Sequence, residues 1–107
     1  MSGLGDMGNL LKQAQEMQRQ LDKAKSDLSE RKVEGQAGGG AVRVELSADR
    51  QEVLSVHLDP EILRGGDSSM VEDSVQAALR DALHRAKELE KEVLGRVTGG
   101  MNLPGLF

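Results

Sequence analysis

Apolar side chains recur at heptad spacing along the first third of the chain. The members of this stripe alternate in steps of four and three residues and are Leu10, Ala14, Met17, Leu21, Ala24 and Leu28. Such spacing places them on one side of an α-helix, and a stripe of this kind packs against a partner helix. Asn9 is a suitable N-cap. The pattern therefore predicts a helix that follows Asn9 and runs to about Glu30, after a Gly-rich flexible tail over residues 1–8.

The apolar period changes to two in the middle of the chain. The apolar members of the two alternating runs are Val42, Val44 and Leu46, then Leu54, Val56 and Leu58. Alternation of apolar and polar residues indicates half-buried strands, here joined by residues 47–51. Residues 32–35 fit a preceding strand that turns through Gly38–Gly40. We expect a three-stranded antiparallel meander with one apolar face.

Helical signals return after the third predicted strand. Asp59 followed by Pro60 is an N-cap with proline at the first helical position, so a short helical turn over 61–64 is expected. Ser69 and Glu72 have capping-box spacing and predict a last helix from about Met70 to Val97.

The apolar face of this last helix narrows along its length. Its broad first half comprises Val71, Val75, Ala78, Leu79, Ala82 and Leu83. A face of that width suits a helix that covers a sheet. Beyond Ala86 the apolar residues are sparser, so we expect the second half to protrude beside another helix. Asp81–Arg85 and Glu92–Arg96 have the spacing of i,i+4 ion pairs.

These elements predict one α+β domain over residues 1–107, with tails at 1–8 and 99–107. The chain has no Cys, Trp or Tyr and a single Phe, Phe107, so Val, Leu, Ile, Met and Ala must form the core. A core of this kind in 107 residues gains stability from association, and we expect a homodimer.

The composition also indicates where in the cell the protein is expected. The absence of cysteine suits a reducing cytoplasm. No apolar run is long enough to span a membrane, and the N-terminal residues do not resemble a signal peptide, so no membrane partner is expected. The net charge of −4 is uneven: residues 1–32 carry +1, residues 33–69 carry −4 and residues 70–107 carry −1. The helices can therefore present basic patches although the molecule is acidic.

Four segments in this order resemble the YbaB/EbfC family of bacterial nucleoid-associated proteins. They are Leu10–Gln18 (LLKQAQEMQ), Val33–Val42 (VEGQAGGGAV), Leu58–Leu63 (LDPEIL) and Thr98–Gly105 (TGGMNLPG). The resemblance implies an α/β dimer with protruding helical arms, often likened to tweezers. It also implies binding to double-stranded DNA in the nucleoid, with a role in nucleoid organisation and gene expression.

DNA binding requires cations directed at phosphates. The candidates on the two helices and at the end of the first are Lys12, Arg19, Lys23, Lys25, Arg31, Lys32, Arg85, Lys87, Lys91 and Arg96. Taken without the resemblance, these charges fit a solvated helix surface. Phosphate contacts do not read sequence, so we expect low sequence specificity and altered DNA conformation. The scarcity of aromatic side chains argues against modules that stack single-stranded bases.

The residues offer little for catalysis. No Gly-Lys-Ser/Thr follows Gly38–Gly40, so these glycines indicate a tight strand connection and not a phosphate loop. His57 and His84 stand alone, without clustered metal ligands, and fit surface positions. No nucleophile lies in a known motif. We expect no enzyme activity, cofactor, metal or small-molecule substrate.

Two other readings remain open. Two long helices that flank β hairpins also suit a prefoldin-like chaperone or scaffold, in which the stripe and the tail Met101–Phe107 would hold protein clients. The turn at Asp59-Pro60 and the Gly-rich segment 35–40 are not features of that pattern. A module that binds a protein partner within a DNA-processing complex is the other reading.

Overall fold

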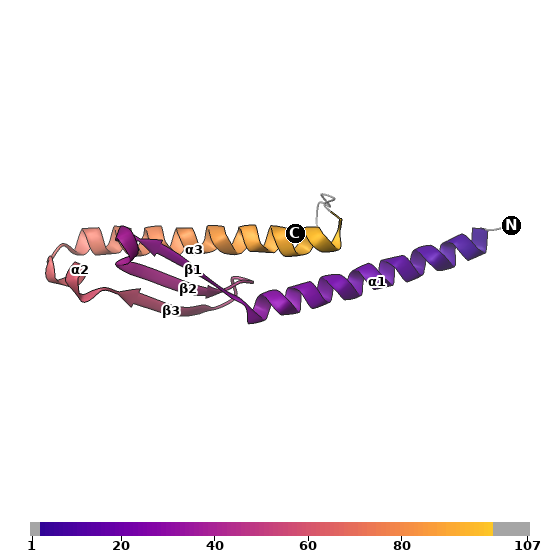
Figure 1. Cartoon of the computed structure of the whole chain (residues 1–107), viewed down its shortest axis with the longest axis horizontal. Coiled ribbons are helices and arrows are strands. Elements are labelled where there is room, and N and C mark those ends of the chain that lie inside the picture. Colours follow the sequence, from indigo (N-terminus) through magenta and orange to yellow (C-terminus); the bar gives the residue numbers. More distant parts are fainter. Residues whose placement is uncertain (1–2, 100–107) are drawn as a thin grey trace.

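The computed structural model describes residues 3–99 and confirms the predicted α+β order. Its elements are α1 (Gly3–Glu30), β1 (Lys32–Ala37), the 3-10 turn η1 (Gly38–Gly40), β2 (Val42–Ser47), β3 (Val53–Leu58), α2 (Pro60–Arg64) and α3 (Ser68–Val97). The chain forms an elongated molecule of 77 × 21 × 17 Å, with the sheet at one end and α1 projecting from the other (Figure 1). None of the helices in the described part of the chain has the length and apolar character of a membrane span.

The sheet is an antiparallel meander in the order β1-β2-β3. β1 and β2 pair from Lys32 opposite Ser47 to Ala37 opposite Val42. All three glycines of η1 have positive φ, at 62°, 67° and 95°, which residues with a Cβ rarely adopt. The tight strand connection predicted for Gly38–Gly40 is thus confirmed.

Helix α3 covers the apolar face of β1 and β2. Val42, Val44 and Leu46 are buried against Ala78 and Ala82 and form the core with them. Because alanine side chains are short, the backbone of α3 can lie close to the sheet.

Gly35 permits the closest approach of α3 to β1. A Cβ at this position would lie 2.2 Å from the carbonyl oxygen of Ala78 and 2.2 Å from the backbone nitrogen of Ala82. Only glycine lets a strand and a helix backbone meet at that separation.

β3 departs from the half-buried strand that its alternation predicts. α3 lies over β1 and β2, and β3 is the strand farthest from it (Figure 1). Consequently Val53 and Val56 are 60% and 53% exposed. A register shift between Glu45 and Leu46 leaves Leu54 without a Cα partner on β2, so the period of two predicted from Leu54 to Leu58 is interrupted at its start.

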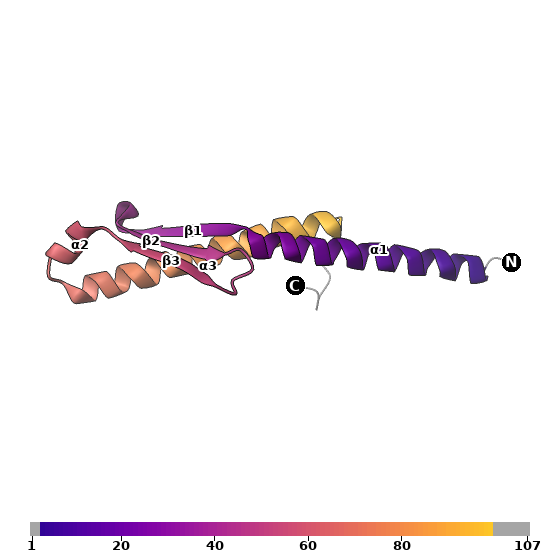
Figure 2. The same ribbon diagram turned by 90° about the horizontal axis from the view of Figure 1, so that it is seen from below.

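The outer half of α3 extends past the sheet and packs against α1, as predicted. Leu94 of α3 is buried with Leu21 and Ala24 of α1, and Met17 and Val97 pack against this cluster. The two helices run in opposite directions, and α1 continues well beyond the end of α3 (Figures 1 and 2). Only the inner half of the heptad stripe is therefore covered.

Two helix starts differ from the predictions. α1 begins at Gly3, so Asn9 lies inside the helix and Gly3–Gly8 belong to it and not to the tail. α3 begins at Ser68 with Asp67 as its N-cap, whose side chain accepts from the backbone N–H of Met70, so the capping box from Ser69 is wrong. The cap of α2 by Asp59 is confirmed by a 3.0 Å bond from the backbone N–H of Glu61. Residues 100–107 of the predicted tail lie outside the described residues.

Candidate nucleic-acid interface

Lys12, Arg19 and Lys23 share one face of α1. Steps of seven and four residues keep side chains on the same side of a helix. This face lies opposite the heptad stripe, because each of the three is about half a turn from Leu10 and Leu21. The cations therefore point away from α3. Arg19 pairs with Glu16 at 3.1 Å, while Lys12 and Lys23 take part in no ion pair among the described residues.

The other predicted cations of the N-terminal region lie at the base of α1. Lys25 lines a cavity of about 310 Å³ together with residues of the β2–β3 turn and α3. Arg31 is exposed between α1 and β1, and its carbonyl accepts from the backbone N–H of Ala48 at 2.8 Å. The ammonium of Lys32 lies 3.7 Å from the carboxylate of Glu45.

The cations predicted on α3 are more fully paired than those on α1. Arg85 lies 3.0 Å from Asp81, and Lys91 lies 3.7 Å from Glu88. Arg96 pairs with Glu92 across one turn, as its spacing predicts. Lys87 is exposed and takes part in no ion pair in the described part of the chain. All ten predicted cations are exposed, and those without an ion pair to another described residue lie mostly on α1.

The structure adds Arg80 to the basic surface and places His84 on the same face. With Lys87 and Lys91 they form a stripe at steps of four, three and four residues on the face of α3 that points away from the sheet. Arg80 and His84 are exposed. The 3–4 spacing is present in the sequence, but the packing of Ala78 and Ala82 against the sheet decides which face of α3 points outward.

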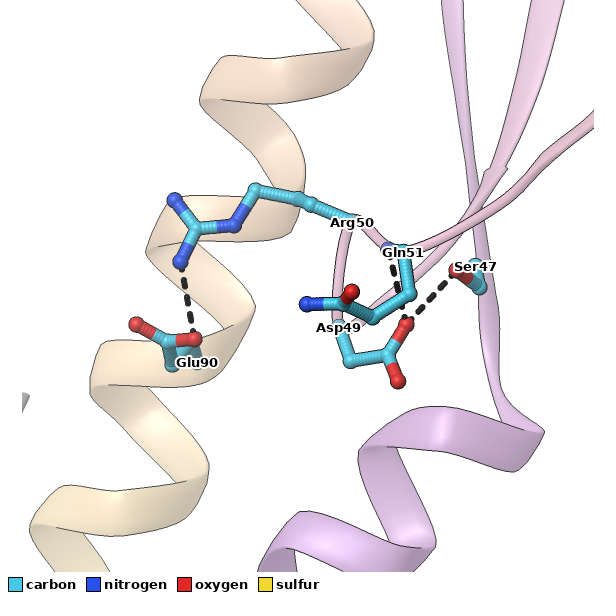
Figure 3. Close-up of polar contacts among 5 residues, drawn as sticks. All are labelled: Ser47, Asp49, Arg50, Gln51 and Glu90. Carbon is cyan, nitrogen blue, oxygen red and sulfur yellow. Dashed lines mark hydrogen bonds and ion pairs between the residues drawn. The ribbon is translucent and has the colours of Figure 1, made fainter.

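A cluster of polar contacts fixes the β2–β3 turn at the base of α1 (Figure 3). The Arg50 guanidinium reaches the Glu90 carboxylate on α3 at 2.9 Å. On the other side of the turn, Asp49 accepts from the Ser47 hydroxyl at 2.7 Å and from the backbone N–H of Gln51 at 3.1 Å. These hydrogen bonds, the Ser47 bond first, lower the pKa of Asp49.

The side chain of Asp81 contacts the edge of β1 that faces away from β2. Its carboxylate accepts from the backbone N–H of Gln36 at 2.9 Å and from Arg85 at 3.0 Å. The Gln36 bond is the larger cause of the lowered pKa of Asp81, with Arg85 second. An edge-strand N–H that is satisfied in this way is not available to another strand.

This arrangement places positive charge on exposed faces of both long helices. The Lys12–Arg19–Lys23 face and the Arg80–Lys91 stripe belong to different sides of the molecule, since one points away from α3 and the other away from the sheet. No group of three or more His, Cys, Asp or Glu within the described residues could hold a metal ion. Such a surface can bind a polyanion by attraction to its phosphates.

Comparison with known proteins identifies the family. The family model described as the YbaB/EbfC DNA-binding family matches residues 3–101. A nucleoid-associated protein of Alkaliphilus metalliredigens is 42% identical over 107 residues, which is 100% of this chain and 93% of that protein. The nucleoid-associated protein TTE0040 of Caldanaerobacter subterraneus is 38% identical over 95% of this chain and 91% of its own length.

The same fold occurs in a crystal structure of the uncharacterized protein HP0035 from Helicobacter pylori. The TM-score is 0.69 with 20% sequence identity, over 87% of this chain and 94% of that one. This likeness concerns the fold alone. With a family model that spans nearly the whole chain and relatives at about 40% identity, the chain belongs to the YbaB/EbfC DNA-binding family.

Proposed function

We propose that the protein binds double-stranded DNA in the nucleoid, as a homodimer and with low sequence specificity, and thereby alters DNA conformation and gene expression. The observation that carries the proposal is the face of α1 with Lys12, Arg19 and Lys23, where exposed cations point away from the rest of the molecule. Membership of a DNA-binding family supports it.

The acidic net charge does not oppose binding through the helices. Residues 33–69 account for a net −4, whereas residues 1–32 carry +1. The Debye length is about 8 Å at physiological salt, so acidic groups on the sheet are screened from phosphates held at the projecting part of α1. Release of counterions from DNA then favours association.

Low specificity is expected because the contacts proposed here are to phosphates. Contacts from Lys12, Arg19 and Lys23 to phosphate oxygens would position the duplex without reading its base edges. A rod of two helices can lie along the DNA backbone without a recognition helix set in the major groove.

Exposed apolar residues on β3 and α3 support the homodimer. Val53 and Val56 pair with Leu46 and Val44, so they lie on the side of the sheet that α3 occupies. On α3 the exposed Leu79 and Leu83 form the flank next to the core residues Ala78 and Ala82, on the side away from Asp81 and the β1 edge. The open side of β3 and this flank of α3 together form a surface that a second copy would cover.

The proposal is tested by measuring the anisotropy of labelled duplexes of unrelated sequence at low salt. The double variant Arg19→Glu, Lys23→Glu is expected to bind each duplex roughly tenfold or more weakly, because two phosphate contacts become repulsive. The matched control is Arg43→Glu, Arg64→Glu, which changes the net charge equally on the sheet and on α2.

Equal losses in both double variants would show that net charge alone governs binding and would contradict a site on α1. Strong preference for one duplex would contradict low specificity. Absence of binding by the wild type at low salt would refute the DNA proposal.

The prefoldin-like alternative predicts retention of an unfolded protein by the exposed apolar residues of α1. The comparisons give it no support, since the family is a DNA-binding one. Inclusion of a reduced, unfolded client in the same measurements tests it directly.

A further inference from the structure

The apolar stripe of α1 has an outer half that nothing in the described chain covers. Because α1 begins at Gly3, the stripe gains Met7, which lies three residues before Leu10 and so continues the alternating steps of four and three. Met7 and Leu10 are 62% and 63% exposed, and the neighbouring Leu11 is also exposed. The inner half of the same stripe, with Leu21 and Ala24, is buried against α3.

The outer half of the stripe, called the seam below, has the spacing by which two helices pack side by side. It continues the half that packs against α3 without a change of period, so a helix can pack against both halves. The positions that flank it are uncharged at Leu11, Gln13 and Gln18, and Asp6 is the one acidic flank. No cluster of like charges therefore prevents the seam from pairing with a copy of itself.

We propose that the outer half of α1 pairs antiparallel with the outer half of α1 from a second copy of the chain. In this register Met7 of each chain packs against Leu10 of the other, and Ala14 lies at the edge of the contact. The pairing goes beyond the proposed DNA binding and uses a different surface from the β3–α3 side proposed for the homodimer.

The position of α3 excludes the parallel alternative. α3 covers the inner half of the stripe as far as the contact of Met17 and Val97. A parallel partner helix would have to continue into that space to reach its own sheet. An antiparallel partner instead continues past the N-terminus of α1, where Figure 1 shows no other element.

The proposed pairing leaves the basic face of α1 available. Lys12 and Arg19 lie about half a turn from Leu10. Two paired copies would therefore present cations on the outer sides of the seam, directed away from each other. Two units bound to separate DNA segments would be joined in this way, which makes the protein a bridge between duplexes.

Sedimentation velocity over a range of concentrations tests the proposal on the full chain. Leu10→Glu places a charge in the seam, and Gln15→Glu adds the same charge to α1 outside it. We expect Leu10→Glu to raise the concentration needed for the largest assembly roughly tenfold or more, because buried apolar area is lost in both copies, and Gln15→Glu to match the wild type. Identical behaviour of the two variants would overturn the proposal.

The lack of cysteine allows a test of the register. Facing positions of a helix pair come within the Cα separation that a disulfide needs. A mixture of Met7→Cys and Leu10→Cys chains should cross-link between positions 7 and 10 faster than either variant cross-links to itself. Faster formation of 7–7 or 10–10 products would overturn the antiparallel register.

Two further variants separate this inference from the proposed homodimer and from another occupant of the seam. Val56→Glu alters the β3 surface, so the 7–10 cross-link should persist in it even if the homodimer is lost. A chain that ends at Gly99 lacks residues 100–107, the other apolar segment that could lie on the seam. If that truncation abolished the effect of Leu10→Glu, the seam would be assigned to the tail and our inference would be wrong.

Discussion

The guanidinium of Arg50 lies 2.9 Å from the carboxylate of Glu90 and ties the β2–β3 turn to α3 at the base of the projecting α1. The side chains are 34% and 22% exposed, so the pair is partly shielded from solvent. Arg50 has φ of 63°, which is the left-handed region. The turn thus combines a favourable ion pair with an unfavourable backbone conformation at one residue.

This combination predicts an unusual order of stability at position 50. Arg50→Ala should lower the free energy of unfolding by up to about 1 kcal/mol, since it removes the ion pair and keeps the left-handed backbone. Arg50→Gly loses the same pair but relieves about 1 kcal/mol of backbone cost and should unfold close to the wild type. Urea denaturation measures both. Equal stability of the Ala and Gly variants would contradict the role given to the backbone, and Glu90→Gln isolates the ion pair.

Gly35→Ala should be among the most destabilising single substitutions in the chain. The added methyl group would meet the α3 backbone at 2.2 Å, so the helix must move away from β1 and the core opens. We expect a loss of about 3 kcal/mol or more in thermal or chemical unfolding. Gly8→Ala is the control. Apart from its chain neighbours and the nearby backbone of α1 itself, no atom lies within 4 Å of a Cβ built at Gly8, so that change should be neutral or stabilise by up to about 1 kcal/mol. Similar effects of the two substitutions would contradict the close approach.

Asp49 and Asp81 should make the fold sensitive to acid. The pKa of each is lowered by hydrogen bonds present in the folded chain, chiefly from the Ser47 hydroxyl and from the Gln36 N–H. A carboxyl with a lowered folded pKa stabilises the fold above its unfolded pKa, and this stabilisation is lost as the pH falls through the folded value. Tm should therefore fall as the pH drops below about 4.

Asparagine variants test whether Asp49 and Asp81 cause the fall in Tm at low pH. Asp81→Asn and Asp49→Asn should each be less stable than the wild type at pH 7 and should lose less Tm between pH 6 and pH 3. If a variant lost as much Tm as the wild type between pH 6 and pH 3, the carboxylate that it lacks would not contribute to the acid sensitivity. Because both side chains are accessible to solvent, the test rests on the direction of the change in Tm and not on its size.

The Arg80–Lys91 stripe on α3 leads to a separate prediction for DNA binding. If Arg80 and Lys87 contact phosphates, Arg80→Gln with Lys87→Gln should reduce the slope of log K against log salt by about 1.8. The change should be the same for duplexes of different sequence. Arg43→Gln on the exposed sheet face should leave the slope unaltered. An unchanged slope in the double variant would show that Arg80 and Lys87 do not contact phosphates.

The proposed homodimer surface is tested by Val56→Glu. Val56 is already 53% exposed in the single chain, so the substitution should leave the fold intact by circular dichroism. A charge in an apolar contact should convert the homodimer to monomer when mass is measured by light scattering. Gln36→Glu, on the opposite face of the sheet, is a charge-matched control. A Val56→Glu homodimer as tight as the wild type would move the contact elsewhere.

Local patterns predicted most of the elements in this protein. The period of the Val42–Leu46 run, the Asp59-Pro60 cap and the i,i+4 spacing of Asp81 and Arg85 depend on neighbours within a few residues, and the structure confirms each. The helix starts were less predictable. Glycine lowers helix stability by only about 1 kcal/mol, so it did not prevent α1 from beginning at Gly3.

The sequence by itself determined the order of helices and strands, because hydrophobic period and capping act over one or two turns. The tertiary structure alone decided which apolar residues are covered. Gly35 lets α3 settle over β1 and β2, and this placement exposes Val56 on β3. Likewise, the end of α3 near Met17 leaves Leu10 uncovered, although both belong to one stripe. Burial depends on contacts between segments far apart in the chain, and a periodic pattern shows which face is apolar but not what covers it.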